Sequence, residues 1–303
     1  NTGANYTYQW SLNGAVIPGA TNPTFTANAA GNYTVTLSDT ANCSFTSAPA
    51  TVVVNPLPTV TISASGNTTV CQGSAVNLNA GSGTSYASYQ WNLNGAPIAA
   101  ATTATFAATS TGSYSLTVTD ANGCSATSNT VSVTIRELPV ATITGNSAIC
   151  QGGSTILSAN TGTGRTYQWK RNNVNIIGAT TANYTAITAG TYTVTVTSNG
   201  CSATSNAITV TVNSLPTVSV SATGSTSFCP GGSVVLTAST DPANTLQWRK
   251  NGVNITGATG ISYTASDSGN YTVRVTSPAG CSANSNGIQV TPATNPSATI
   301  SAS

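Results

Sequence analysis

Four copies of one residue pattern, about 79 residues apart, dominate this sequence. In each copy a tryptophan, a tyrosine and a cysteine follow in the same order, and equivalent residues are 77 to 81 positions apart. The recurring residues are Trp10, Trp91, Trp169 and Trp248; Tyr33, Tyr114, Tyr192 and Tyr271; and Cys43, Cys124, Cys201 and Cys281. A fixed period of this length indicates one small domain copied in tandem. We therefore expect the function to belong to the array rather than to a single site.

Within each copy the pattern is that of antiparallel β-strands. Residues 192–196 (Tyr-Thr-Val-Thr-Val) and 208–212 (Ile-Thr-Val-Thr-Val) alternate apolar side chains with threonine, the period of a half-buried strand. Helical spacing is absent throughout. The pairs Asn94-Gly95 and Asn251-Gly252 predict tight hairpins. About seven short strands around one tryptophan predict an all-β chain of antiparallel β-sandwich domains.

Proline-containing segments set the expected domain boundaries. They occur at residues 55–58, 137–139, 214–216 and 295–296. The expected units are a partial repeat that lacks its first strands (1–55), three complete repeats (56–136, 137–213 and 214–292) and the first strand of a further repeat (293–303). We call the first four units repeats 1 to 4. A partial repeat cannot close its own core. We therefore expect either a piece of a longer stalk or a filament in which a neighbouring copy supplies the missing strands.

Repeat 4 carries a resemblance to the immunoglobulin (Ig) superfamily. Residues 267–273 (Asp-Ser-Gly-Asn-Tyr-Thr-Val) resemble the Asp-x-Gly-x-Tyr-x-Cys of the sixth Ig strand, with valine in place of the cysteine. Residues 234–238 (Val-Val-Leu-Thr-Ala) resemble the second strand, with alanine in its cysteine place, and Trp248 stands where the core tryptophan would be. The resemblance extends over all four copies. It implies a tandem array of Ig-like sandwiches in which the four tryptophans and the four tyrosines are core residues.

A narrower resemblance concerns the order Cys-x-Gly, Gln-Trp, Gly-x-Tyr-x-Val and Gly-Cys in one repeat. This order is similar to that of the Ig-like and PKD-like repeats of large cell-surface proteins of Bacteroidetes. Gliding-motility adhesins and other type IX secretion substrates are among those proteins. The resemblance implies an extracellular, cell-surface location.

The seven cysteines, in a chain without histidine, argue against a zinc site. Structural disulfides in an oxidising compartment are the expectation. In an Ig sandwich the second and sixth strands run the same way, with Ala159 and Val194 level at mid-core. Cys150 lies nine residues before Ala159, and Cys201 lies seven residues after Val194. The two cysteines are therefore expected toward opposite poles of the sandwich. A disulfide requires Cα atoms within about 7 Å.

This geometry favours disulfides between consecutive repeats, although two pairings remain open. The preferred inter-repeat pairs are Cys71–Cys201 and Cys150–Cys281, which leave Cys43, Cys124 and Cys229 to partners outside this sequence. The alternative pairs lie within repeats and are Cys71–Cys124, Cys150–Cys201 and Cys229–Cys281.

Composition excludes several functions. Only 4% of residues are charged and the net charge is +2, so no basic patch for nucleic acid is expected. No apolar run reaches the length of a membrane span. The acids are spread singly over the repeats, so we expect no catalytic pair, no metal site, no cofactor and no enzyme activity. They are Asp39, Asp120, Glu137, Asp241 and Asp267.

Three functions compete. The first is a structural stalk or fibre, whose partners are neighbouring repeats and other copies of the chain. The second is an adhesin module that binds surface glycans through loops between strands. The loops 81–88, 160–166 and 239–245 do vary, and Tyr86 is the loop aromatic that such a role would use. The third is a linker array beside an enzyme elsewhere in a longer protein.

Overall fold

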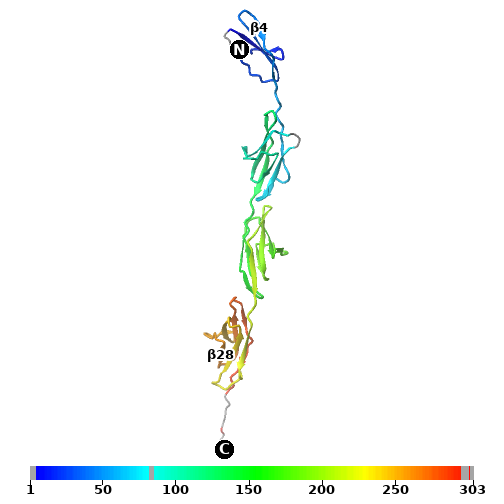
Figure 1. The fold of residues 1–303 in the computed structure, drawn as a ribbon. Coiled ribbons are helices and arrows are strands. Elements are labelled where there is room, and N and C mark those ends of the chain that lie inside the picture. Colours follow the sequence, from blue (N-terminus) through cyan, green and yellow to red (C-terminus); the bar gives the residue numbers. More distant parts are fainter. Residues whose placement is uncertain (1–4, 82–84, 295–299, 301–303) are drawn as a thin grey trace. The chain divides into compact units, whose positions relative to one another are not determined.

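The computed structural model describes residues 5–81, 85–294 and 300, and no helix occurs in these residues. None of this described part could therefore cross a membrane as a helix. The described strands pair in seven sheets. In Figure 1 they gather in four groups that follow the order of repeats 1 to 4. The chain divides into two compact units, Asn1–Arg136 and Glu137–Ser303, and each is described by itself.

Repeat 2, in the first unit, folds as two sheets that share one core. One sheet has the strand order β11-β8-β6; the other has the order β10-β9-β12-β14-β7, with β13 also paired to β12. All pairs are antiparallel except β14–β7. The strands are β6 (Ile62–Ala64), β7 (Thr69–Cys71), β8 (Val76–Ala80), β9 (Ser88–Leu93), β10 (Ala96–Pro97), β11 (Thr105–Ala108), β12 (Gly112–Thr119), β13 (Ser125–Thr127) and β14 (Val131–Arg136).

Repeats 3 and 4, in the second unit, have the same two-sheet plan. The sheets of repeat 3 are β15-β17-β20 and β16-β23-β21-β18-β19, with β22 on β21; those of repeat 4 are β24-β25-β28 and β27-β26-β29-β30, with β31 on β29. The strands of repeat 3 are β15 (Ile143–Thr144), β16 (Ala148–Cys150), β17 (Thr155–Ala159), β18 (Thr166–Arg171), β19 (Val174–Asn175), β20 (Asn183–Ala186), β21 (Gly190–Ser198), β22 (Cys201–Thr204) and β23 (Ile208–Asn213). The strands of repeat 4 are β24 (Val218–Thr223), β25 (Val234–Thr240), β26 (Thr245–Lys250), β27 (Val253–Asn254), β28 (Ser262–Ala265), β29 (Gly269–Thr276), β30 (Ser282–Asn284) and β31 (Ile288–Val290).

Repeat 1 has one sheet, of order β2-β1-β3-β4 with β5 on β3. Its strands are β1 (Thr7–Leu12), β2 (Ala15–Val16), β3 (Gly31–Ser38), β4 (Ser44–Thr46) and β5 (Ala50–Val52). Residues 24–27, which correspond to β11 of repeat 2, form no strand. In repeat 2 that strand pairs with β8, and the described part of repeat 1, residues 5–55, contains no strand equivalent to β8.

The complete repeats are all-β Ig-like sandwiches, as the sequence predicts, but they contain more than seven strands. The opening segment of repeat 2 is divided between the two sheets as β6 and β7, and a two-residue strand, β10, completes a hairpin with β9. In repeat 4 the residues that correspond to β7 form no strand, although the carbonyls of Thr226 and Phe228 accept the N–H groups of Thr291 and Ala293 at 2.9 and 2.7 Å. There Pro230 stands where Gln72 and Gln151 donate backbone N–H groups to the last strand, at 2.7 and 2.8 Å, and proline has no N–H to donate.

A buried tryptophan lies at the centre of each complete repeat. Trp91, Trp169 and Trp248 are 0% exposed, and each indole N–H donates to a backbone carbonyl at 2.9 Å. The recurring tyrosines Tyr114, Tyr192 and Tyr271 are also buried, as is Tyr33 of repeat 1. The expectation for Trp10 is wrong in degree: it is half-buried, because no second sheet lies over the ring.

The residues around the tryptophan have structural roles that explain their recurrence. The side-chain Nε2 of Gln90 donates to the carbonyls of Trp91 and Ile98 at 2.9 and 2.8 Å, so it ties β9 to the segment after β10. Asn94 has a φ of 51° and Gly95 a φ of 83°, the conformation of a two-residue hairpin turn that asparagine and glycine adopt readily. The Asn94 Oδ1 also accepts the backbone N–H of Ser113 at 2.9 Å.

A Ser-Asn pair near the last strand joins the two sheets of each complete repeat. In repeat 3 the Asn206 side chain accepts the backbone N–H of Ile143 at 3.0 Å and donates to its carbonyl at 3.3 Å. Asn129 bonds Ile62 in the same way, and Asn286 bonds Val220. Each asparagine lies just before the last strand of one sheet, and the residue that it bonds lies in the opening strand of the other sheet. We call this contact the asparagine latch. The sequence reasoning missed it.

We predict that Asn206→Ala loosens the opening strand of repeat 3. Two side-chain hydrogen bonds to the Ile143 backbone are lost, which should lower the local free energy of opening by about 1–3 kcal/mol. Hydrogen exchange of the full chain, read by mass spectrometry on peptides containing Ile143, measures the change. Asn183→Ala, at an exposed strand position of the same repeat, is the matched control. Equal exchange in the two variants would contradict the latch.

Candidate functional site: the cysteine joints

A disulfide joins repeat 3 to repeat 4 within the second unit. It links Cys150 to Cys281, whose Cα atoms are 5.5 Å apart across 131 residues of sequence. Cys150 is the last residue of β16 and lies beside Asn213, the last residue of β23, in a parallel pair. The backbone N–H of Gln151 donates to the Asn213 carbonyl at 2.8 Å. The first half of the disulfide is therefore fixed where the chain leaves repeat 3.

The other half of the disulfide is held by a turn of repeat 4. Cys281 lies between β29 and β30 and is fully buried. Its backbone N–H donates to the Ser277 Oγ at 3.2 Å, and its carbonyl accepts the Ser277 N–H at 2.8 Å. Its Sγ lies 4.0 Å from the carbonyl oxygen of Asn213. Both cysteines thus contact the residue at which repeat 3 ends.

The peptide linker between these repeats is short. Strand β23 ends at Asn213 and β24 begins at Val218, which leaves residues 214–217, including Pro216, between them. The linker and the disulfide are two covalent connections at one joint. A proline already restricts a linker, and a second connection removes rotation about it. The joint between repeats 3 and 4 is therefore constrained covalently on two sides.

The alternative pairing within repeats does not occur in the structure. Cys150 and Cys281 bond each other, which excludes Cys150–Cys201 and Cys229–Cys281, and Cys124 is a free thiol, which excludes Cys71–Cys124. Cys71 and Cys201 are both disulfide-bonded. Cys71 ends β7 and lies opposite Arg136 of β14, which is the place that Cys150 has in repeat 3.

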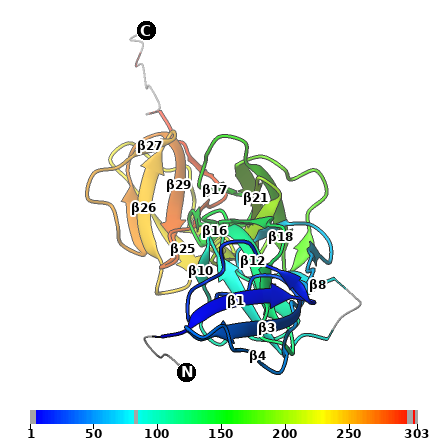
Figure 2. The ribbon, with the colours of Figure 1, turned by 90° about the horizontal axis from the view of Figure 1, so that it is seen from above.

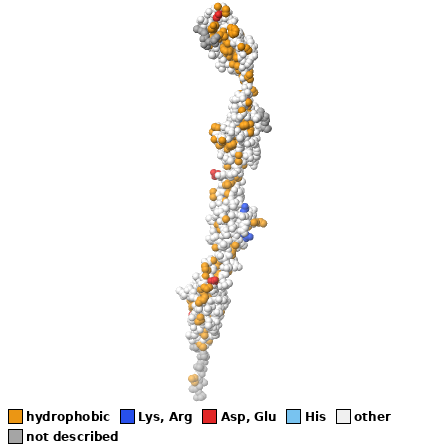
Figure 3. Space-filling model, in the orientation of Figure 1, with side chains coloured by type: hydrophobic (Ala, Val, Ile, Leu, Met, Phe, Trp, Pro, Cys, Tyr) orange, Lys and Arg blue, Asp and Glu red, His pale blue; other side chains and the backbone are white. Residues whose placement is uncertain are grey.

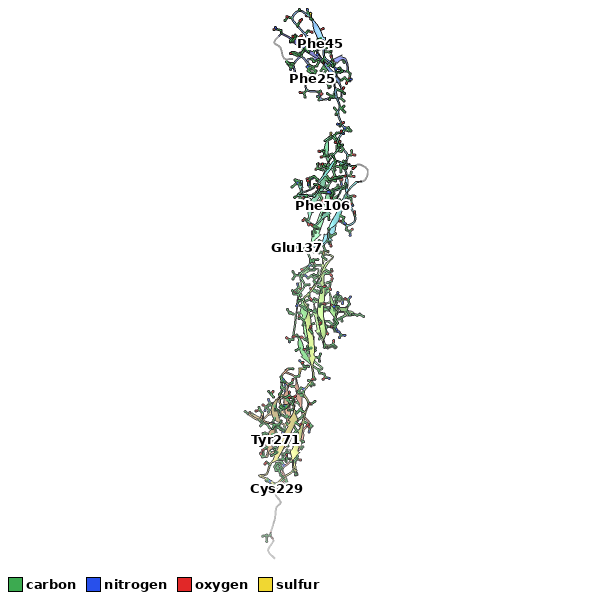
Figure 4. All side chains as sticks on the ribbon, viewed as in Figure 1. Phe25, Phe45, Phe106, Glu137, Cys229 and Tyr271 are labelled. Carbon is green, nitrogen blue, oxygen red and sulfur yellow. A yellow bond between two sulfur atoms is a disulfide. The ribbon has the colours of Figure 1, made fainter. Side chains whose placement is uncertain are left out.

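The free thiols occupy the same two kinds of turn as the bonded cysteines. The carbonyl of Cys229, labelled in Figure 4, accepts the N–H of Gly232 at 3.0 Å, as that of Cys150 accepts Gly153 at 2.8 Å. The N–H groups of Cys43 and Cys124 donate to aspartates four residues earlier, each at 2.9 Å. Their turns thus resemble that of Cys281, in which a serine takes the place of the aspartate.

Repeat 1 presents an open apolar face. Phe25 stacks on Trp10 with ring centroids 5.7 Å apart and meets Tyr33 at 5.8 Å. The equivalent ring in repeat 2, Phe106, contacts the equivalent residues Trp91 and Tyr114. It also packs against a core cluster that includes Leu78 of β8. Figure 4 labels both phenylalanines. Repeat 1 therefore has the same aromatic stack as repeat 2, but its described residues lack the second sheet that covers this stack in repeat 2.

The final segment of repeat 1 also lies apart from any strand partner. Residues 53–55 follow β5 outside any strand, whereas the equivalent residues 134–136 pair with β7 in repeat 2. Val53 and Val54 are 70% and 57% exposed. In repeat 1, Ala48 replaces the latch asparagine, so this contact with an opening strand is missing too.

The remaining candidate residues have local structural roles. Tyr86, the proposed glycan-binding aromatic, donates to the carbonyl of Thr59 and packs edge-on against Tyr89 at 5.7 Å, so its ring is not a free platform. Asp39 and Asp120 cap their own turns. In the described residues no three His, Cys, Asp or Glu side chains are grouped to hold a metal. Figure 3 shows how sparse charged side chains are on the face in view.

The buried tyrosines act as fixed donors. Each hydroxyl donates to the carbonyl four residues earlier, as in Tyr114 to Ser110 at 2.9 Å and Tyr271 to Asp267 at 3.1 Å. Burial raises the pKa of both phenols above the ordinary value of 10.0. The hydroxyls therefore stay protonated and can donate. Each one fixes the turn that precedes its own strand, β12 or β29, and this contact is the tyrosine corner of an Ig sandwich.

The chain is similar, at low sequence identity, to several known proteins. A family model described as a domain of unknown function (DUF8696) matches residues 140–214. No curated protein matches. The structure of the N-terminal eight Ig domains of Down syndrome cell adhesion molecule is 17% identical, with a TM-score of 0.35, over 95% of this chain and 44% of that one. A three-Ig-domain structure of titin is 11% identical, with a TM-score of 0.37, over 75% of this chain and 95% of that one. Murine CEACAM1b is 18% identical, with a TM-score of 0.29, over 51% of this chain and all of that one.

Proposed function

We propose that this chain is a non-enzymatic structural segment of an extracellular stalk or fibre in which disulfides couple consecutive Ig-like repeats. The observation that carries the proposal is the Cys150–Cys281 disulfide between repeats 3 and 4. A disulfide inside one sandwich would stabilise that sandwich alone, whereas this one constrains the joint. Disulfides persist in oxidising compartments, which supports a location outside the cytosol.

The same coupling extends, in this proposal, to repeats 2 and 3 through Cys71–Cys201. Two observations support it. Cys71 has the strand position of Cys150, and Cys201 has the sequence position of Cys281. Both are disulfide-bonded. Cys43, Cys124 and Cys229 would then be the halves of further joints whose partners are outside this sequence.

The repeat boundaries and the biological source are part of the proposal. We propose residues 56–136, 137–213 and 214–292 as complete repeats and 1–55 as a partial one; separate sheets in each range support this division. Residues 293–303 would open a further repeat, although 295–299 and 301–303 lie outside the described residues. The motif order supports a cell-surface protein of Bacteroidetes, of the gliding-motility or type IX secretion kind, with a role in adhesion or filament formation.

Covalent coupling of repeats 3 and 4 predicts a redox-dependent joint. Fluorophores placed through non-natural amino acids at Asn183 and Ser262, two exposed and equivalent strand positions, report the distance between the repeats by single-molecule energy transfer. We expect reduction to broaden the distribution of distances, because only the linker then connects the repeats.

The double variant Cys150→Ser/Cys281→Ser is the control for this measurement. Its distribution should be broad with and without reductant. A wild-type distribution that stays equally narrow after reduction would contradict the coupling role, because the linker alone would then fix the joint.

A second candidate function is self-assembly through repeat 1, favoured by its open apolar face. A neighbouring copy of the chain would supply strands that cover Trp10 and pair with residues 24–27 and 53–55. Such strand addition satisfies exposed backbone groups and buries apolar side chains together.

The self-assembly candidate predicts that an added strand segment binds repeat 1. A peptide with the sequence of residues 59–81, carrying Cys71→Ser, contains the strands that complete repeat 2. We expect it to protect Trp10 of the full chain from acrylamide quenching, because the other three tryptophans are already buried. The same peptide with Leu78→Asp is the control. Protection by neither peptide, or by both equally, would contradict the candidate.

A further inference from the structure

Two arginines lie on adjacent strands of repeat 4, on the outer face of a sheet. In β26 and β29, Arg249 is opposite Thr272 and Arg274 is opposite Gln247, so the arginines are diagonal neighbours. Their inward neighbours Trp248, Val273 and Val275 are fully buried. Side chains alternate between the faces of a sheet, and the arginines therefore face outward. Figure 2 shows β26 beside β29.

The arginines line a groove with polar walls. Arg249, Arg274, Ser282, Ala283 and Asn284 surround a hollow of about 240 Å³. A second hollow, of about 390 Å³, shares Arg274 and Ser282 with the first. Its lining adds Thr245, Leu246, Gln247, Asn254, Thr276 and Gly280. The two hollows adjoin at Arg274 and Ser282, and we refer to both together as the groove. The lining of the second hollow is mostly hydroxyl and amide groups.

Among the described residues, no carboxylate pairs with either arginine of this groove. Arg249 donates to the carbonyl of Gly252, but its Nε is buried without a partner. Arg274 donates to the Ser282 Oγ at 3.2 Å. A guanidinium has five N–H donors, so several donors of each arginine have no protein partner.

The acidic residues of repeat 4, Asp241 and Asp267, have other partners than these arginines. Asp267 pairs with Lys250 at 2.9 Å, and Asp241 accepts a backbone N–H of its own turn. Like charges on neighbouring strands destabilise a sheet. An anion bound between the guanidinium groups would remove that repulsion.

The fold does not require arginine at these positions. In repeat 2 the equivalent residues are Asn92 and Thr117, which form a neutral hydrogen bond of 3.0 Å. In repeat 3 they are Lys170 and Thr195, a single positive charge. The pair of guanidinium groups is thus peculiar to repeat 4 in a chain with seven basic residues in all.

We propose that this groove binds an acidic polysaccharide, with a carboxylate or sulfate group held between Arg249 and Arg274. Guanidinium groups bind the oxygens of such anions through paired hydrogen bonds. The hydroxyl and amide groups of the adjoining hollow suit the hydroxyl groups of the next sugars. This binding activity goes beyond the structural role proposed above and does not depend on the disulfide joints.

The test measures binding of the full chain to three polymers by biolayer interferometry at low salt. The probes are dextran sulfate, polygalacturonate and neutral dextran. We expect binding to the sulfated polymer, the carboxylated polymer or both, and the difference between them identifies the anion. We expect Arg249→Gln/Arg274→Gln to bind at least about tenfold more weakly, because charge-assisted hydrogen bonds are lost.

A charge-matched variant separates this site from general attraction. Lys170→Gln/Arg171→Gln in repeat 3 removes the same net charge and should bind like the wild type. Acrylamide quenching of the total tryptophan fluorescence checks that each variant is folded, because exposure of the buried Trp169 or Trp248 would increase the quenching. The proposal is overturned if the two double variants bind equally, if neither acidic polymer binds, or if neutral dextran binds as well as the acidic ones.

Discussion

Burial of one tryptophan between two sheets is the constraint on which each repeat depends. In repeats 2, 3 and 4 the indole is completely covered and its N–H is bonded to a backbone carbonyl. The aromatic stack, the tyrosine corner and the asparagine latch all hold elements around that ring. Repeat 1 keeps the stack but has one sheet, and its Trp10 remains half-buried. Packing of the second sheet, rather than the aromatic stack alone, therefore completes the domain.

Different interactions operate within repeats and between them. Within a repeat, apolar burial and neutral hydrogen bonds dominate, since only 4% of residues are charged. Between repeats 3 and 4, the four residues of the linker and the Cys150–Cys281 disulfide form the joint. Such a division suits an array, because each of repeats 2 to 4 has its own core while the joint between repeats 3 and 4 limits how they move. Arg249 and Arg274 depart from this pattern, since neither burial nor the joint accounts for them.

Much of this fold could be predicted from the sequence, because its signals are local. Alternation of apolar side chains with threonine predicts the strands, and the Asn-Gly pairs predict the hairpins. The spacing of about 79 residues between equivalent residues predicts the repeats. The opposite poles of an Ig sandwich favour Cys150–Cys281 but leave pairing within repeats open, and the structure contains the Cys150–Cys281 disulfide. The asparagine latch could not be predicted, since Asn206 bonds a backbone 63 residues away. The arginine groove was missed for a related reason: alternation assigns a side chain to a face but does not say which residues of two strands become neighbours.

Disulfide mapping tests the central claim most directly. The basic residues divide the chain into tryptic peptides 1–136, 137–165, 172–249 and 275–303, which separate the cysteines of interest. After free thiols are blocked, mass spectrometry without reduction shows which peptides remain linked. Coupling between repeats predicts that 137–165 is linked to 275–303 and 1–136 to 172–249. A link between 137–165 and 172–249 would mean Cys150 is bonded to Cys201 or Cys229, and would contradict the account.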